Sequence, residues 1–225
     1  MRRTTFLGLV LLVIGFAPRP AAAAPILGAS LIATGGDVTV TYVGDFAGDR
    51  SNLFLSSVGG VELGTPFLVF SNDGTFSPGD VVTLLDATYL FDAGEELIFS
   101  LANTDEFGPG YGTYFTGPAF RNPDSHVHAL VDGAPFDLAG GYPPEFFVAL
   151  ALAGVTSGDG NTVVGFEDRP DCFAPGVACR EEIPGGPYDP AIQADFDYND
   201  LIYAFSGVRA AEPPDPSAPE PATLF

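Results

Sequence analysis

Short runs in which apolar and polar residues alternate recur along the chain from about residue 36 onward. In the run 37–43, Val38, Val40 and Tyr42 alternate with Thr39 and Thr41. Because successive side chains of a strand point to opposite faces, this alternation predicts a half-buried strand. Comparable runs lie at 52–56, 66–70, 81–85, 96–101, 112–116, 126–131, 146–152, 162–166 and 201–206.

Turn-forming residues separate these runs, as at Gly59-Gly60, Pro78-Gly79 and Asp132-Gly133. About ten short strands at this spacing are typical of two packed antiparallel sheets. The sequence therefore predicts an all-β fold, an antiparallel β-sandwich with a jelly-roll-like arrangement. The run 146–152 is continuously apolar, and its pattern fits a buried strand or a short helical turn equally well.

The beginning of the chain has the features of a secretory signal peptide. Arg2 and Arg3 form a basic start, residues 6–16 form an apolar segment, and residues 21–24 are small. This order predicts a signal peptide over residues 1–23 and export to the periplasm, cell surface or extracellular matrix. The apolar segment is too short for a stable membrane span.

The remaining chain divides into one domain and a tail. Residues 24–208 carry the strand-like runs without a second boundary, which predicts a single β-sandwich domain. Residues 209–225 are rich in proline, a composition that favours an extended segment unable to bury a core.

The charge balance of the chain argues against nucleic acid as a partner. The chain has no lysine, and its eight arginines face 29 acidic residues. Three of those arginines lie in the predicted signal peptide, so the mature chain holds five and has a formal charge of −24. Such a chain repels nucleic acid, because binding to phosphates requires Lys or Arg. It also lacks the lysine of a phosphate-binding loop.

Two acidic clusters adjoin apolar runs near the C-terminal end. The candidate ligands in these clusters are Glu167, Asp168, Asp195, Asp197, Asn199 and Asp200. Carboxylates at this density repel one another unless a cation or water separates them, and Ca²⁺ takes six to eight oxygen ligands of this kind. The clusters therefore predict a calcium site. The alternative is that the same residues only form hydrogen-bonded turns.

Spacing limits how these residues share one ion. Asp195, Asp197 and Asn199 match the first ligand positions of an EF-hand-type loop, but the glycine and the final glutamate of that loop are missing. Alternate residues of an extended strand lie about 6.6 Å apart, whereas ligands of one Ca²⁺ lie within about 5 Å of one another. We therefore expect some of them to join Glu167 or Asp168 from a neighbouring strand, with the runs 163–166 and 201–205 pairing where a metal bridges their ends.

The cysteines and histidines suggest further sites. Cys172 and Cys179 enclose a Pro-Gly turn, which predicts a disulfide in an exported protein; a zinc site is the alternative, for which a second Cys pair or a nearby His is missing. His126 and His128 are spaced to lie on one strand face. They are candidate metal or ligand-binding residues, whereas the alternative is a half-exposed strand face.

Two motifs in the C-terminal half are together similar to a known signature. They are Gly165-Phe166-Glu167-Asp168 and Asp195-Phe196-Asp197-Tyr198-Asn199-Asp200-Leu201-Ile202. The motifs resemble the G-F-E-D-L … D-R-D-Y-N-D-L-V signature of a bacterial exported domain family of unknown function, found in many proteins with a PEP-CTERM sorting tail. Arg169 and the cysteine-bearing insertion 170–192 depart from that signature. Residues 219–224 also resemble the start of a PEP-CTERM signal.

These observations predict an exported, non-enzymatic structural or binding protein of the cell envelope or extracellular matrix, stabilised by Ca²⁺. Its expected partners are exopolysaccharide or other envelope and matrix proteins. One alternative is a carbohydrate-binding module for exopolysaccharide, with a stacking platform formed by Tyr111, Tyr114, Phe115 and Tyr142. Another is a glycan hydrolase that uses paired carboxylates near Glu167.

Overall fold

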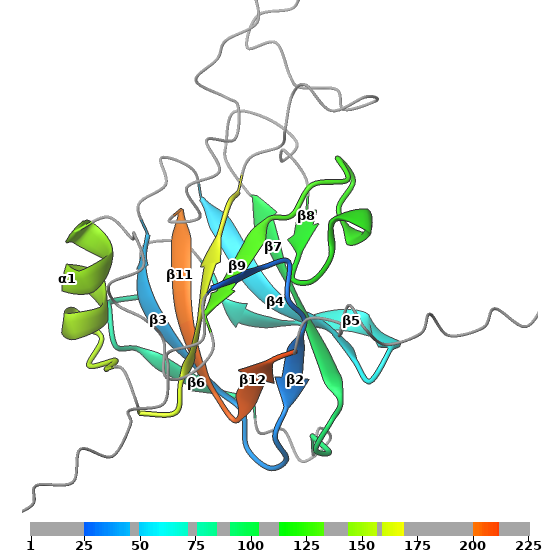
Figure 1. Ribbon diagram of the computed structural model, residues 1–225, viewed down its shortest axis with the longest axis horizontal. Coiled ribbons are helices and arrows are strands. Elements are labelled where there is room, and N and C mark those ends of the chain that lie inside the picture. The colour runs from blue at the N-terminus through cyan, green and yellow to red at the C-terminus, as the bar shows by residue number, and fades with distance from the viewer. Residues whose placement is uncertain are drawn as a thin grey trace, which may run out of the picture.

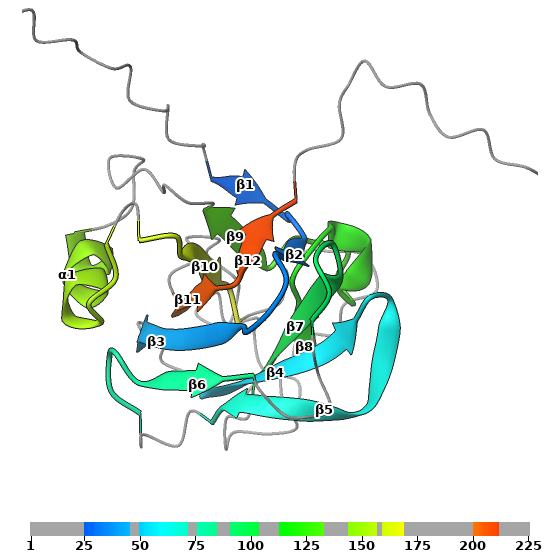
Figure 2. The same cartoon turned by 90° about the horizontal axis from the view of Figure 1, so that it is seen from below.

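The protein is an antiparallel, sandwich-like all-β structure, as the sequence predicts. A computed structural model describes residues 25–45, 50–71, 76–84, 91–103, 113–132, 144–156, 159–168 and 200–211. Within these ranges, the chain forms two antiparallel sheets that lie against each other (Figure 1; Figure 2). The predicted signal peptide (1–23) and residues 212–225 of the proline-rich tail lie outside the described residues.

Among the described residues, the first sheet has six strands. In spatial order these are β1 (Ile26–Leu27), β9 (Ala129–Asp132), β10 (Thr162–Phe166), β11 (Leu201–Ser206), β3 (Thr39–Asp45) and β6 (Val81–Thr83). The second sheet contains β12 (Val208–Ala210), β2 (Leu31–Ala33), β7 (Glu96–Asn103), β4 (Ser51–Val58) and β5 (Val61–Phe70), with β8 (Thr113–Phe115) paired to β7. Strand β12 pairs with β2 through Ala210, so the sheet extends two residues past the predicted domain end at 208.

The core lies between the two sheets and is built from their inward-facing side chains. Along β7, Leu97, Phe99 and Leu101 are fully buried at alternate positions. The ring of Phe99 meets that of Phe205 from the opposite sheet edge to face, with centroids 4.7 Å apart. Burial of such large side chains stabilises each by about 1.5–3 kcal/mol relative to exposure. The period-two pattern thus marks the face of each strand that enters the core.

A helix covers the outer face of the first sheet. Helix α1 (Pro144–Leu152) lies beside β3 (Figure 1), and its Phe146 and Leu150 pack in one cluster with Val163 and Ile202. Strands β10 and β11 are therefore buried on both faces, which explains why their sequences are almost continuously apolar. The ambiguous run 146–152 is a helix. In the described part of the chain, no helix is both long and apolar enough to span a membrane.

Burial of Tyr42 and Tyr203 makes the stability of the fold sensitive to alkaline pH. Burial, followed by the negative charge of Asp45, raises the pKa of Tyr42 from 10.0 to about 12. Burial also raises the pKa of Tyr203. The unfolded chain therefore loses these protons before the folded protein does, and the free energy of unfolding falls as the pH rises from about 10 towards 12.

This alkaline loss can be measured by urea unfolding at several pH values between about 9 and 12. Stability should be level below about pH 10 and should decline above it. The Tyr42→Phe variant, which has no hydroxyl to ionise at this position, should decline less steeply. Identical profiles for the variant and the parent protein would contradict the assignment of this effect to Tyr42.

Candidate functional site

Pairing of β10 with β11 brings Asp200 to the same end of the first sheet as Glu167 and Asp168. The strands are antiparallel, and Phe166 lies opposite Leu201. Glu167 and Asp168 directly follow β10, while Asp200 directly precedes β11. The acidic residues therefore meet just beyond the last strand pair. This pairing of the runs 162–166 and 201–206 is the arrangement expected from the sequence.

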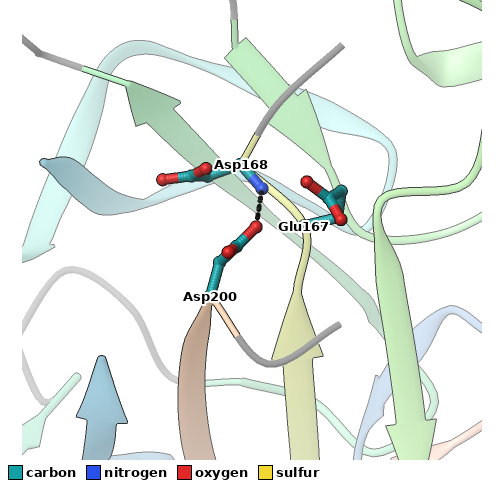
Figure 3. Close-up of side chains that lie close together, drawn as sticks. All are labelled: Glu167, Asp168 and Asp200. Carbon is teal, nitrogen blue, oxygen red and sulfur yellow. Dashed lines mark hydrogen bonds between the residues drawn. The ribbon is translucent and has the colours of Figure 1, made fainter. Parts of the chain in front are cut away.

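The three acidic side chains lie close enough to share one ion. One carboxylate oxygen from each of Glu167, Asp168 and Asp200 lies within 4.8 Å of the other two. Glu167 and Asp168 are fully buried, at 0% exposure, and Asp200 is partly exposed. The backbone N–H of Asp168 donates to Oδ2 of Asp200 over 2.9 Å (Figure 3). This bond joins the start of β11 to the segment that follows β10.

The second sheet also contributes to the site. Ser51, the first residue of β4, donates its hydroxyl hydrogen to Oδ2 of Asp168 over 3.1 Å. Asn103, the last residue of β7, donates from its side-chain amide to the backbone carbonyl of Asp168 over 3.4 Å. Asp168 is thus held by both sheets, at the end of the sandwich where their strands meet.

The buried His128 contacts the backbone of Glu167. Nδ1 of His128 is 3.1 Å from the backbone carbonyl oxygen of Glu167, and Nε2 is 2.7 Å from Oδ2 of Asp124. A carbonyl oxygen only accepts hydrogen bonds, so Nδ1 carries a hydrogen. The ring also stacks on Tyr114, with centroids 3.9 Å apart. These contacts fix the position of the segment that leads from β10 into the acidic cluster.

Burial and the nearby carboxylates shift the pKa values of Tyr114 and His128. Burial raises the pKa of Tyr114 well above its usual value, and the charges of Asp124, Asp168 and Glu167 raise it further. Burial lowers the pKa of His128, while the Asp124 carboxylate and the Glu167 carbonyl act in the opposite direction. The tyrosine hydroxyl therefore keeps its proton beside the carboxylates.

The structure brings together half of the predicted metal ligands. Glu167, Asp168 and Asp200 form the cluster. The other predicted site residues, namely Asp195, Asp197, Asn199, Cys172 and Cys179, lie outside the described residues. The predictions for those five therefore stay predictions.

The two histidines that were predicted to share a strand face do not lie on a strand. Strand β9 begins at Ala129, so both histidines precede it instead of lying on one strand face as expected from the run 126–131. Both ring nitrogens of His128 are engaged by oxygen atoms, and Nδ1 of His126 lies 3.1 Å from the backbone carbonyl of Asp124. Among the described residues, neither histidine belongs to the group placed for a metal.

Sequence reasoning missed Ser51 and Asn103, which contact Asp168, and the hydrogen bond between Asp124 and His128, and it gave Tyr114 a different role. The spacing of four residues between Asp124 and His128 is a local signal that could have indicated their hydrogen bond. Ser51 lies 117 residues from Asp168 in sequence, and Asn103 lies 65 residues from it. No local pattern in the chain indicates those two contacts.

The predicted aromatic platform is wrong at one of its four positions. Tyr114 is fully buried against His128, so it presents no face to a ligand in solution. Phe115 is half-buried. Tyr111 and Tyr142 lie outside the described residues. Because β8 is a strand of the second sheet, its side chains alternate between core and surface and cannot all face outward.

The cluster suits a hard cation better than it suits catalysis. Three carboxylates with oxygens within 4.8 Å match the separation of about 5 Å or less between ligands of one Ca²⁺. A hydrolytic pair must face a cleft that admits substrate and water. Glu167 and Asp168 are fully buried, which is unsuited to contact with a glycan.

Comparisons of the chain with models of protein families, with curated proteins and with solved structures found no match. The structure itself shows an all-β fold with an acidic cluster at the ends of β10 and β11. The resemblance to the bacterial exported domain family stays a prediction from the two motifs. Export, partners and calcium binding are proposals.

Proposed function

We propose that this protein is an exported, non-enzymatic structural or binding protein of the cell envelope or extracellular matrix, and that Ca²⁺ stabilises it. Glu167, Asp168 and Asp200 would supply carboxylate oxygens to the ion. The observation that carries the proposal is the approach of these three carboxylates to within 4.8 Å while two of them are fully buried. The predicted signal peptide supports export.

The physical argument rests on the cost of gathering negative charge away from water. An ionised carboxylate loses hydration when it is buried, and like charges nearby add repulsion. A divalent cation offsets both costs, because it is attracted to every carboxylate at once and replaces their lost water. A bound Ca²⁺ would also tie β10 and β11 together at their ends.

The sandwich is well suited to a structural or binding role. Its two sheets pack on a shared core, and the acidic cluster lies at one end of the sandwich, where Ser51 and Asn103 link Asp168 to the second sheet. Calcium bound there would stabilise contacts between the sheets as well as within one of them. Asp195, Asp197 and Asn199 remain predicted further ligands.

Thermal unfolding of the mature, oxidised protein in EDTA and then in millimolar Ca²⁺ tests the proposal. At free calcium about one hundred times the dissociation constant, linkage gives about 2.7 kcal/mol of stabilisation. For a chain of this length this corresponds to a rise in Tm of about 5–10 °C. Mg²⁺ at the same concentration should stabilise less, because it demands a stricter octahedral geometry. An unchanged Tm in calcium would overturn the proposal.

A further inference from the structure

A groove of about 620 Å³ lies on the outer side of the second sheet, away from the acidic cluster. Strand β7 runs along its floor, the β4–β5 hairpin lies on one side, and β8 with the 3₁₀ helix η1 (Ala119–Arg121) lies on the other. Figure 1 shows β8 and this short helix beside β7. The volume falls within the range of about 300–1,000 Å³ that is usual for small-molecule sites. The groove shares no residue with the proposed calcium site.

The floor of the groove carries hydroxyl groups. Ser100 on β7 lies on the outer side of the sheet between the inward-facing Phe99 and Leu101, but it is only 3% exposed, and its Oγ lies 2.5 Å from Oγ of the partly exposed Ser56 on β4. Ser57 and Thr113 also line the groove. A serine hydroxyl both donates and accepts hydrogen bonds. An entirely apolar ligand would desolvate the partly exposed hydroxyls of Ser56 and Thr113 at a cost, so the groove favours a ligand with polar groups of its own.

One wall of the groove holds a fixed ion pair. Nη2 of Arg121 donates to both carboxylate oxygens of Glu96, over 2.8 and 2.9 Å, and Nη1 donates to the carbonyl of Thr116 over 3.1 Å. The guanidinium also packs over Gly117, where an added Cβ would lie 2.9 Å from Cζ of Arg121. These contacts hold a donor and an acceptor side by side, which lowers the entropy lost on binding a ligand.

An exposed aromatic ring completes the groove. Phe120 is 80% exposed, although a phenylalanine gains from burial. The half-buried Phe115 also contributes to the lining. The face of an aromatic ring is electronegative and attracts C–H groups laid against it. The groove therefore offers an apolar surface beside hydroxyl, carboxylate and guanidinium groups.

We propose that this groove binds a neutral oligosaccharide. A sugar ring has an apolar C–H face, which would stack on Phe120, and hydroxyls, which would bond to Ser56 and the Glu96–Arg121 pair. Anionic ligands are disfavoured, because Glu62 and Glu96 line the groove and the whole chain has a formal charge of −21. The site differs from the platform expected from the sequence, with which it shares Phe115.

Isothermal titration calorimetry of the mature protein with neutral hexasaccharides tests this assignment. Cellohexaose, maltohexaose and mannohexaose serve as probes, and an oligogalacturonate of equal length serves as the anionic comparison. At least one neutral probe should bind more tightly than the anionic one. Phe120→Ala should weaken that binding roughly tenfold or more. Phe120→Tyr, which keeps the ring, should bind like the parent protein.

Leu152→Ala provides the matched control, because Leu152 is a large apolar side chain on α1, is 68% exposed and does not line the groove. It should leave the affinity unchanged. Three results would each overturn the assignment. These are no heat of binding with any neutral probe at millimolar concentration, equal affinity for Phe120→Ala and the parent protein, and tighter binding of the anionic probe.

Discussion

Replacement of Asp200 by asparagine is expected to change thermal stability in opposite directions with and without calcium. In EDTA the variant should unfold at a higher temperature than the parent protein, because one of three carboxylates within 4.8 Å of one another loses its charge. In calcium the variant should unfold at a lower temperature than the parent, because a neutral amide is a poorer ligand for a hard cation than a carboxylate is. Turn-forming residues without a metal would not produce this crossing.

Asparagine suits this test because it changes the charge and almost nothing else. Oδ2 of Asp200 accepts a hydrogen bond from the backbone N–H of Asp168 over 2.9 Å, and an amide oxygen can accept the same bond. Asp200 is also partly exposed, so the new amide hydrogens can reach water. The fully buried Asp168 would be a less clean choice, since its carboxylate also accepts from Ser51.

The expected change in the free energy of unfolding of Asp200→Asn differs in size between EDTA and calcium. In EDTA, relief of repulsion between charges about 5 Å apart should stabilise the variant by about 1 kcal/mol, taking the water-screened limit. In calcium at about one hundred times the parent's dissociation constant, the variant should lose most of the roughly 2.7 kcal/mol that binding supplies. That loss corresponds to about 5–10 °C in Tm.

Asp92→Asn removes the same charge from an exposed position just before β7, outside the acidic cluster. It should change stability by no more than about 0.5 kcal/mol and should keep the full calcium effect. A full calcium shift in Asp200→Asn, or a marked loss of its stability in EDTA, would count against a calcium site at this cluster.

The sequence predicted the parts of this fold that depend on local pattern. Alternation in the run 37–43 placed Val38 and Val40 in the core, where both are fully buried. The acidic residues beside two apolar runs predicted that β10 and β11 pair, which Phe166 opposite Leu201 confirms. These predictions succeeded because side-chain period and turn residues are properties of neighbouring positions.

The local sequence pattern could not identify helix α1. The run 146–152 is apolar at every position, and a continuously apolar segment fits a buried strand as well as a buried helix. The helical conformation of this run depends on tertiary packing, because Phe146 and Leu150 pack on Val163 and Ile202 on the outer face of the first sheet. That face is available only after the sheet has formed.

The residues that surround the candidate site could not be predicted from the sequence either. Ser51 and Asn103 reach Asp168 because β4 and β7 end beside it, and that meeting depends on how the sheets pack. The spacing of His126 and His128 predicted a shared strand face, but β9 begins only at Ala129. Hydrogen bonds to Asp124 and Glu167 then determine the position of His128.

Replacement of Gly207 by alanine is expected to destabilise the protein by about 3 kcal/mol. Ser206 ends β11 in the first sheet and Val208 begins β12 in the second, so the chain passes from one sheet to the other at this single residue (Figure 1). The carbonyl of Gly207 also accepts a hydrogen bond from the N–H of Thr34 over 2.9 Å. The turn therefore joins the two sheets and cannot easily move.

Two separate costs add up at this position. Gly207 has a φ of +74°, a left-handed conformation that costs a residue with a Cβ about 1 kcal/mol or more. An added Cβ would also overlap the carbonyl oxygen of Asp37 and lie 3.3 Å from Cα of the fully buried Val38. Forcing apart a packed backbone typically costs a further 1–3 kcal/mol, roughly. The sum corresponds to a fall in Tm of about 6–12 °C.

Gly154→Ala separates these two costs. Gly154 has nearly the same φ, +72°, but a Cβ added there would meet no atom within 4 Å. It should therefore lose only the conformational part, about 1 kcal/mol. Urea unfolding of both variants in EDTA, where calcium does not contribute, measures the difference. Equal losses would mean that the crossing between the sheets moves to accommodate the methyl group, and that backbone conformation alone requires a glycine there.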